Sequence, residues 1–318
     1  MQSLNDPAVL FFVFGILAGA VKSNLEIPPA ISRFLSLYLL MALGLKGGFA
    51  LAESGLTTQV AISLSIAVVL AIAIPLLGFA VLRKFVSQLD AAAIAATYGS
   101  ISAVTFVTAT QSLENQNIAF GGYMSAAMAL MESPAIILAV LLANVVRGRQ
   151  AGTQPRFALG KVLHESLTDG AQLLLLGAMA IGLLTGDAGQ AAMQPFSGDL
   201  FKGMLAFFLL DMGLLTARNL TQTKERPPLL IGYAVVAPVA HAALALFLAY
   251  IFKVPAGDGA LLMVLAASAS YIAVPAVLRF AIPEANPSLY LGLSLGVTFP
   301  INILLGIPFY SMIALAVL

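Results

Sequence analysis

The sequence predicts an all-α polytopic membrane protein with ten transmembrane helices, arranged as two inverted five-helix repeats that contain interrupted helices. Two observations support this prediction: the apolar composition, and a set of features that recurs at one offset along the chain. Of the 318 residues, 60% are hydrophobic and 9% are charged, which is more apolar than a single soluble core requires. The net charge of +1 and the lack of cysteine exclude a nucleic-acid-binding surface, disulfides and cysteine-ligated metals.

Ten apolar stretches approach the roughly 20 residues that a membrane-spanning helix needs. They run over residues 7–21, 29–52, 58–82, 90–113, 118–146, 170–186, 197–217, 227–252, 257–280 and 287–316. All lysines and arginines except Lys46, Lys202 and Lys253 belong to odd-numbered connections, and basic residues mark the cytoplasmic side. We therefore expect a multi-pass protein of the cell inner (plasma) membrane, with both termini outside and the long 147–169 connection in the cytoplasm.

Features of the first half recur about 168 residues later. The matching pairs are Ile27-Pro28 with Gln194-Pro195, Gly44-Leu45 with Gly213-Leu214, Asp90 with Asp258, and Ser100–Ser102 with Ser268–Ser270. Five expected spans separate the members of each pair, so the two copies cross the membrane in opposite directions. The sequence thus predicts a first repeat over 1–150 and a second over 151–318, without a separate soluble domain. Such inverted repeats are typical of secondary transporters, which bind their cargo near the middle of the membrane.

The most informative polar segments lie in the fourth and ninth spans, at Gly99–Thr105 and Ser268–Pro275. Small residues with hydroxyl groups allow close helix approach, and Pro275 lacks a backbone donor and can interrupt a helix. An interrupted helix exposes N–H groups that suit an anion. Packing through small residues is the alternative, but the symmetric placement favours a site. The candidate anion-binding residues are Gly99, Ser100, Ser102, Thr105, Ser268, Ser270 and Tyr271.

Two carboxylates, Glu132 and Asp211, lie inside expected spans. A charge near the bilayer centre costs at least ~2.5 kcal/mol, so each is expected to face a cavity, a cation or a hydrogen-bonding partner, unless it reaches water at a helix end. A hard cation prefers oxygen ligands. The candidate sodium ligands are Glu132, Asp211, Asn302, Ser102 and Ser270, although Asn302 could equally serve as a structural cap.

Five segments together carry a family resemblance: Leu43–Gly48, Gly99–Thr105, Met131–Ala135, Leu210–Gly213 and Ser268–Pro275. They resemble the sodium-dependent bicarbonate permease family, known chiefly from cyanobacterial high-affinity bicarbonate uptake. The resemblance implies bicarbonate symport with Na+, a homotrimer, and a core domain that moves against a gate domain. It also implies control by a small PII-like protein on the cytosolic face, and anion or sodium contacts for Ser102, Thr105, Ser268 and Ser270.

The chain departs from the family pattern in three places. Ala103 and Val104 stand where the family is richer in glycine and serine, and Glu132 stands where the family has aspartate. The cytosolic loop is also shorter than in the cyanobacterial members. The first two departures bear on which anion is carried, and the third bears on whether a PII-like protein binds.

Other functions make different demands on the residues. A sodium/proton exchanger needs adjacent acids that titrate, whereas Glu132 and Asp211 lie in non-equivalent spans; a symporter of small organic anions is a further alternative. An intramembrane hydrolase needs a nucleophile with an activating base or a metal site, and His241 is the one histidine within an expected span. A passive channel would not require inverted repeats. We therefore expect a transporter and not an enzyme.

Overall fold

The computed structural model describes residues 6–55, 57–151, 170–223 and 228–318, in which the regular structure is helical and no strand occurs. The first part of the chain forms α1 (Pro7–Ala20), α2 (Pro29–Ser54), α3 (Thr58–Leu82), α4 (Gln88–Gly99), α5 (Ala103–Asn115) and α6 (Met124–Ala151). The second part forms α8 (Gly170–Met193), α9 (Phe201–Thr223), α10 (Pro228–Ile251), α11 (Ala256–Ala267), α12 (Ala273–Ala281), α13 (Pro287–Leu293), α14 (Phe299–Ile301) and α15 (Ile307–Val317). Short π-helical segments at Gln194–Asp199, Ser294–Thr298 and Asn302–Gly306 complete the second part.

Seven helical stretches in the described chain are long and apolar enough to cross a membrane, which confirms a multi-pass α-helical membrane protein. The count falls below ten partly because α1 and α11, with 14 and 12 residues, are shorter than the roughly 20 residues of a full span. In addition, the stretch Leu173–Arg218 is one 46-residue helical path that covers two expected spans. Gly186, with a φ of 51°, kinks this path near the expected end of the first of them.

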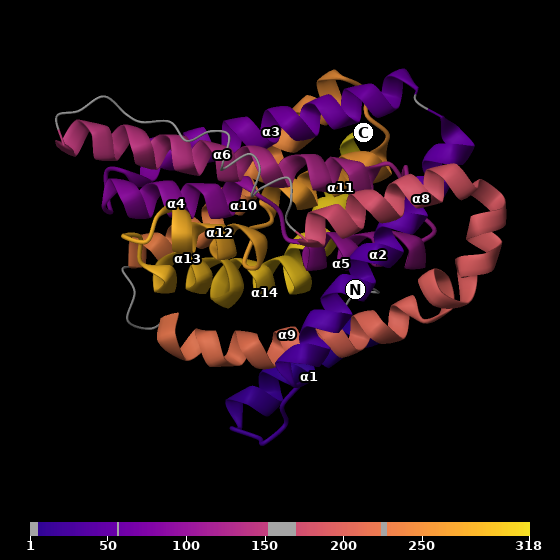
Figure 1. The fold of residues 1–318 in the computed structure, drawn as a ribbon, viewed down its shortest axis with the longest axis horizontal. Helices are drawn as coiled ribbons and strands as arrows, with labels where there is room; N and C mark the ends of the chain where they lie inside the picture. Colours follow the sequence, from indigo (N-terminus) through magenta and orange to yellow (C-terminus); the bar gives the residue numbers. More distant parts are fainter. Residues whose placement is uncertain (1–5, 56, 152–169, 224–227) are drawn as a thin grey trace.

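The helices pack in two groups (Figure 1). In the four-helix group, α1 packs against α9 and α2 packs against α8. In the crossing group, α3 packs against α4 and α6, while α10 and α15 pack against α11. The crossing group also pairs α11 with α5 and α12 with α4, so each interrupted helix lies alongside the other.

Glycines allow close backbone contacts inside the four-helix group. A Cβ atom added to Gly15 of α1 or Gly213 of α9 would lie 2.3 Å from a main-chain oxygen of the partner helix. At Gly48 of α2 and Gly182 of α8 the corresponding distances are 2.1 Å and 2.6 Å. Because lipid gives helices no hydrophobic reason to associate, such close backbone packing is a main source of helix–helix affinity in membranes.

The replacement Gly182→Ala is expected to destabilise the fold by about 1–3 kcal/mol, because the new methyl group meets backbone that cannot turn away. Gly177→Ala on the same helix is the matched control, since a Cβ there meets no atom within 4 Å. Thermal unfolding of the two purified variants in detergent measures the difference. Equal unfolding temperatures for the two variants would contradict the backbone contact between α2 and α8.

An ion pair joins the end of α6 to the loop that follows α12. Arg147 donates to both carboxylate oxygens of Glu284, at 2.9 and 2.6 Å, and to the carbonyl oxygen of Ala281 at 2.9 Å. The guanidinium lowers the pKa of Glu284 below its ordinary value of 4.5. Because the two side chains are 33% and 47% exposed, solvent screens the pair and its contribution to stability is small.

The lowered pKa of Glu284 predicts a pH dependence of the stability. The contribution of the ion pair is fully present above the unfolded-state pKa and is lost as the pH falls through the lower folded-state pKa. Unfolding temperatures measured between about pH 3 and about pH 7 should therefore fall more steeply on acidification in the native chain than in Arg147→Met. Parallel pH curves for the two proteins would show that the pair does not stabilise the folded state.

Candidate functional site

Two helices are interrupted inside the crossing group. The fourth expected span is divided between α4, which ends at Gly99, and α5, which begins after its N-cap Ser102. The ninth is divided between α11 and α12, with residues 268–272 between them. Pro275 is not the point of interruption, because it lies in the first turn of α12, where a missing N–H leaves no helical hydrogen bond unmade.

Each interruption supplies hydrogen-bond partners for the other. The backbone N–H of Ser102 donates to Oγ of Ser268 at 3.0 Å, and the backbone N–H of Ser270 donates to the carbonyl oxygen of Thr97 at 2.8 Å. All four residues are buried. Non-helical backbone in a membrane needs partners within the protein, so the two breaks satisfy each other at the point where the helices cross.

The first turns of α5 and α12 are held by corresponding serines. Oγ of Ser102 accepts from the backbone N–H of Thr105 at 3.2 Å and from its hydroxyl at 2.9 Å. Oγ of Ser270 accepts from the backbone N–H of Val274 at 3.3 Å. A side-chain cap satisfies one of the free donors of a helix N-terminus and leaves others available.

A small cavity of about 50 Å³ opens at these two helix starts. Its lining includes Ser102 and Ala103 at the start of α5, Ser270 and Ala273 at the start of α12, and Glu132 of α6. Residues of α2 and α8 also line it, so the cavity lies between the crossing group and the four-helix group. Since one water needs about 10–15 Å³ of such volume, the cavity has room for roughly three to five waters, or one small oxyanion.

Four of the expected anion-binding residues lie near the cavity without lining it. Thr105 and Ser268 contact Ser102, as described above. Gly99 packs against Pro75 of α3, whose ring would be 2.5 Å from an added Cβ. The hydroxyl of Ser100 is buried and has no hydrogen-bond partner among the described residues.

The structure separates the expected sodium ligands. Glu132, Ser102 and Ser270 line the small cavity. The side-chain amide of Asn302 donates to the carbonyl oxygen of Ala267 at 2.8 Å, so this residue holds the end of α11 as a cap would. Asp211 instead lines a second cavity, where it accepts a hydrogen bond from the hydroxyl of Ser32.

This second cavity, of about 880 Å³, forms a vestibule next to the first. The two share the lining residues Ser36, Tyr271 and Ile272, so the two cavities adjoin at these residues. Ser32 and Ser36 were not expected from the sequence to contribute. Their spacing of four residues, which places both on one face of a helix, is the signal that would have identified them.

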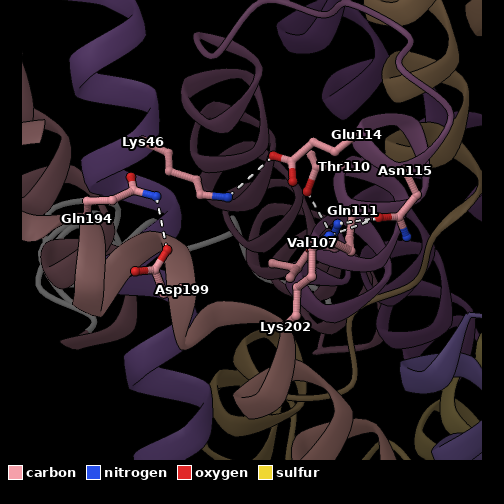
Figure 2. A network of polar contacts seen from close by, with 9 residues as sticks. All are labelled: Lys46, Val107, Thr110, Gln111, Glu114, Asn115, Gln194, Asp199 and Lys202. Carbon is pink, nitrogen blue, oxygen red and sulfur yellow. Dashed lines mark hydrogen bonds and ion pairs between the residues drawn. The ribbon is translucent and has the colours of Figure 1, made fainter. Parts of the chain in front are cut away.

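Polar bridges join the two helix groups at the far end of α5, about 20 Å along the helix from the small cavity (Figure 2). Nζ of Lys46 on α2 lies 3.3 Å from a carboxylate oxygen of Glu114 and 4.4 Å from the ring centre of Phe201. Nζ of Lys202 on α9 donates to the side-chain oxygen of Asn115 at 3.1 Å. The groups are therefore bridged at this end and separated by the vestibule at the other.

These features define a polytopic α-helical membrane protein in which two interrupted helices cross at a small polar cavity. A search of curated proteins finds no match. The chain belongs to the Na+-dependent bicarbonate transporter superfamily, whose family model matches residues 7–315. The resemblance read from the sequence is thereby confirmed, and the protein is a transporter and not an enzyme.

The N-cap geometry of Ser102 makes a prediction about local stability. Ser102→Ala should cost about 1 kcal/mol, the usual value of a lost N-cap, and should speed hydrogen exchange of the amides in the first turn of α5. Ser65→Ala on α3 is the control, because that exposed hydroxyl only bonds back to the carbonyl of its own helix at Ala61. Unchanged exchange over residues 103–106 would show that Ser102 does not cap α5.

Proposed function

We propose that the protein carries bicarbonate into the cytoplasm together with Na+, by alternating access. The anion binds in the small cavity at the starts of α5 and α12, and sodium binds beside Glu132. The observation that supports this assignment is the convergence of the N-termini of α5 and α12 on a cavity of oxyanion size. The family to which the chain belongs supplies the substrate and the coupling ion as its name states them.

The anion is held by backbone dipoles and hydroxyl groups in this proposal. A helix N-terminus carries about half a positive charge and free N–H donors, and two such ends contribute here. Ser102 and Ser270 add hydroxyls at the cavity. Tyr271 lines both cavities and packs edge-on against Phe299, with ring centroids 5.1 Å apart, and therefore forms the wall between the site and the vestibule.

Sodium fits the opposite side of the same cavity. The carboxylate of Glu132 supplies the negative charge, and serine hydroxyls with freed carbonyl oxygens supply the neutral oxygen ligands that a hard cation prefers. Asn302 supports this arrangement by holding the carbonyl of Ala267 at the end of α11. Asp211 and Ser32 offer a further pair of oxygen ligands in the vestibule, along the path by which sodium leaves.

We propose further that residues 1–150 and 151–318 are inverted repeats with ten membrane helices in all. The exchange of partners supports this: the first helix of each half packs on the second helix of the other, α1 on α9 and α8 on α2. Glycine contacts correspond in the two pairs, Gly15 with Gly213 and Gly182 with Gly48. The interruptions α4–α5 and α11–α12 also occupy corresponding places.

The proposed orientation has both termini outside and the vestibule facing the cytoplasm. Arg33 and Arg218, which line the vestibule, belong to connections that the distribution of basic residues assigns to the cytoplasm. In this orientation the bridges at Lys46 and Lys202 close the outer side. The four-helix group then serves as the gate domain against which the crossing group moves as the core domain.

Homotrimeric assembly, location in the inner (plasma) membrane and control by a PII-like protein stay predictions. The loop on which such a regulator would act is mostly residues 152–169, which lie outside the described residues. Sodium/proton exchange is disfavoured by the geometry, because Glu132 and Asp211 line different cavities and so form no adjacent pair of acids.

Uptake of labelled bicarbonate into proteoliposomes tests the proposed function. An inward sodium gradient should drive accumulation, and a matched potassium gradient at the same pH should not. The double replacement Ser102→Ala and Ser270→Ala should lower sodium-driven uptake at least about tenfold, since a hydrogen bond to a charged group contributes about 1.5–3 kcal/mol. Ser65→Ala provides the control for reconstitution.

Two results would count against the proposal. Native uptake in the double variant would remove these serines from the site. An absence of sodium-driven uptake by the folded native protein would refute bicarbonate symport and favour another small anion or proton exchange.

A further inference from the structure

Asp90 and Asp258 occupy the same place in the two interrupted helices. Each is the third residue of its helix, in α4 and in α11 respectively. An acidic residue in the first turn is usually explained by the partial positive charge of the helix N-terminus. Here the carboxylates make specific contacts with loops that follow other helices, and that explanation is incomplete.

The carboxylate of Asp258 binds the loop between α5 and α6. Its Oδ1 accepts from the backbone N–H of Gly121 at 2.6 Å, and its Oδ2 accepts from the hydroxyl of Tyr123. The side chain is 3% exposed. The backbone of α11 also lies close to this loop at the neighbouring residue, because a Cβ on Gly257 would lie 2.1 Å from the carbonyl oxygen of Ala119.

The carboxylate of Asp90 binds the loop between α12 and α13. Its Oδ1 accepts from the backbone N–H of Asn286 at 2.8 Å, while its Oδ2 accepts from the hydroxyl of Ser87, the N-cap of α4, at 2.7 Å. Each acid at the start of one interrupted helix thus holds the loop that follows the other interrupted helix. The contacts are reciprocal, and they lie at both ends of the pair of interrupted helices.

Three sets of hydrogen bonds therefore hold the two interrupted helices together: one at Asp258, one at Asp90 and one between them. The middle one is the pair of hydrogen bonds between the breaks, at Ser102 with Ser268 and at Ser270 with Thr97. Hydrogen bonds at the middle alone would let the two helices rotate about that point. The contacts of Asp258 and Asp90 at the two ends prevent this rotation, so the starts of α5 and α12 keep a fixed separation across the cavity.

We propose that Asp90 and Asp258 are paired positioning residues that set the affinity of the transport site by fixing the separation of these two helix starts. The role rests on the proposed function, since it concerns the same cavity. Neither carboxylate lines that cavity, so each acts through the backbone that it holds.

The test compares Asp90→Ala, Asp258→Ala and the double variant in the full-length protein, with Asp187→Ala, an exposed acid on α8, as control. Each single replacement should raise the KM for bicarbonate and for sodium at least about tenfold, the effect of losing one or more hydrogen bonds to a charged group, with a smaller change in maximal rate. The double variant should raise KM by less than the product of the single effects, because both acids fix one geometry.

Asp90→Asn separates hydrogen bonding from charge. Its side-chain oxygen can still accept from the backbone N–H of Asn286, so its KM should stay close to that of the native protein. Gly257→Ala disturbs the contact of α11 with the loop between α5 and α6 while the carboxylate of Asp258 stays in place. This variant replaces Asp258→Ala if that protein does not fold, and it should raise KM as well. A KM for Asp90→Asn as high as for Asp90→Ala would overturn the proposal in favour of a helix-charge effect.

Hydrogen exchange gives a readout that does not depend on transport. Loss of either acid should speed exchange in the crossing segments 97–105 and 266–274, as well as in the loop that the acid held. Exchange confined to that loop, an unchanged KM with only the maximal rate reduced, or multiplicative effects in the double variant would each overturn the proposal. Failure of the native protein to take up bicarbonate would instead overturn the proposed function, while the exchange result would still decide the positioning role.

Discussion

The rest of the structure depends on how the backbone groups freed by the two helix breaks are satisfied away from water. An unpaired N–H in hydrocarbon costs several kcal/mol, so neither break is tolerable alone. The bonds Ser102 to Ser268 and Ser270 to Thr97 pair one freed backbone N–H from each break with an acceptor on the other interrupted helix. This mutual requirement fixes where the helices cross, and it thereby fixes the position of the cavity.

The positions of the two helix breaks were predictable because hydroxyl-bearing residues recur at one offset along the chain. The correspondence of Ser100–Ser102 with Ser268–Ser270 located both breaks to within a few residues. The sequence could not distinguish Ser102, which caps α5, from Ser100, whose buried hydroxyl does not line the cavity. The roles of the two serines differ because their side chains point in different directions at an irregular turn. The sequence also offers Pro275 as a residue that can interrupt the helix, whereas it lies in the first turn of α12, where no helical hydrogen bond is lost.

Contacts between distant segments were the part that could not be predicted. Asp90 and Asp258 were matched as repeats, yet their partners are the backbone N–H groups of Asn286 and Gly121, and a backbone donor has no residue identity to recognise. For the same reason the sequence left Asn302 either as a sodium ligand or as a structural cap, since the acceptor of its side-chain amide is a main-chain oxygen, that of Ala267. Length does not decide the count of membrane helices either, since α1 and α11, which belong to two of the ten expected spans, are shorter than a full span.

The volume of the small cavity cannot by itself select one small anion from others of the same size. About 50 Å³ suits a small oxyanion, but nitrate and formate are no larger than bicarbonate and carry the same charge. Discrimination among these ions must come from the direction of hydrogen bonds. Bicarbonate alone among the three has a hydroxyl proton to donate, so a hydrogen-bond acceptor in the wall of the proposed site would make the protonation pattern of the cargo the basis of its recognition.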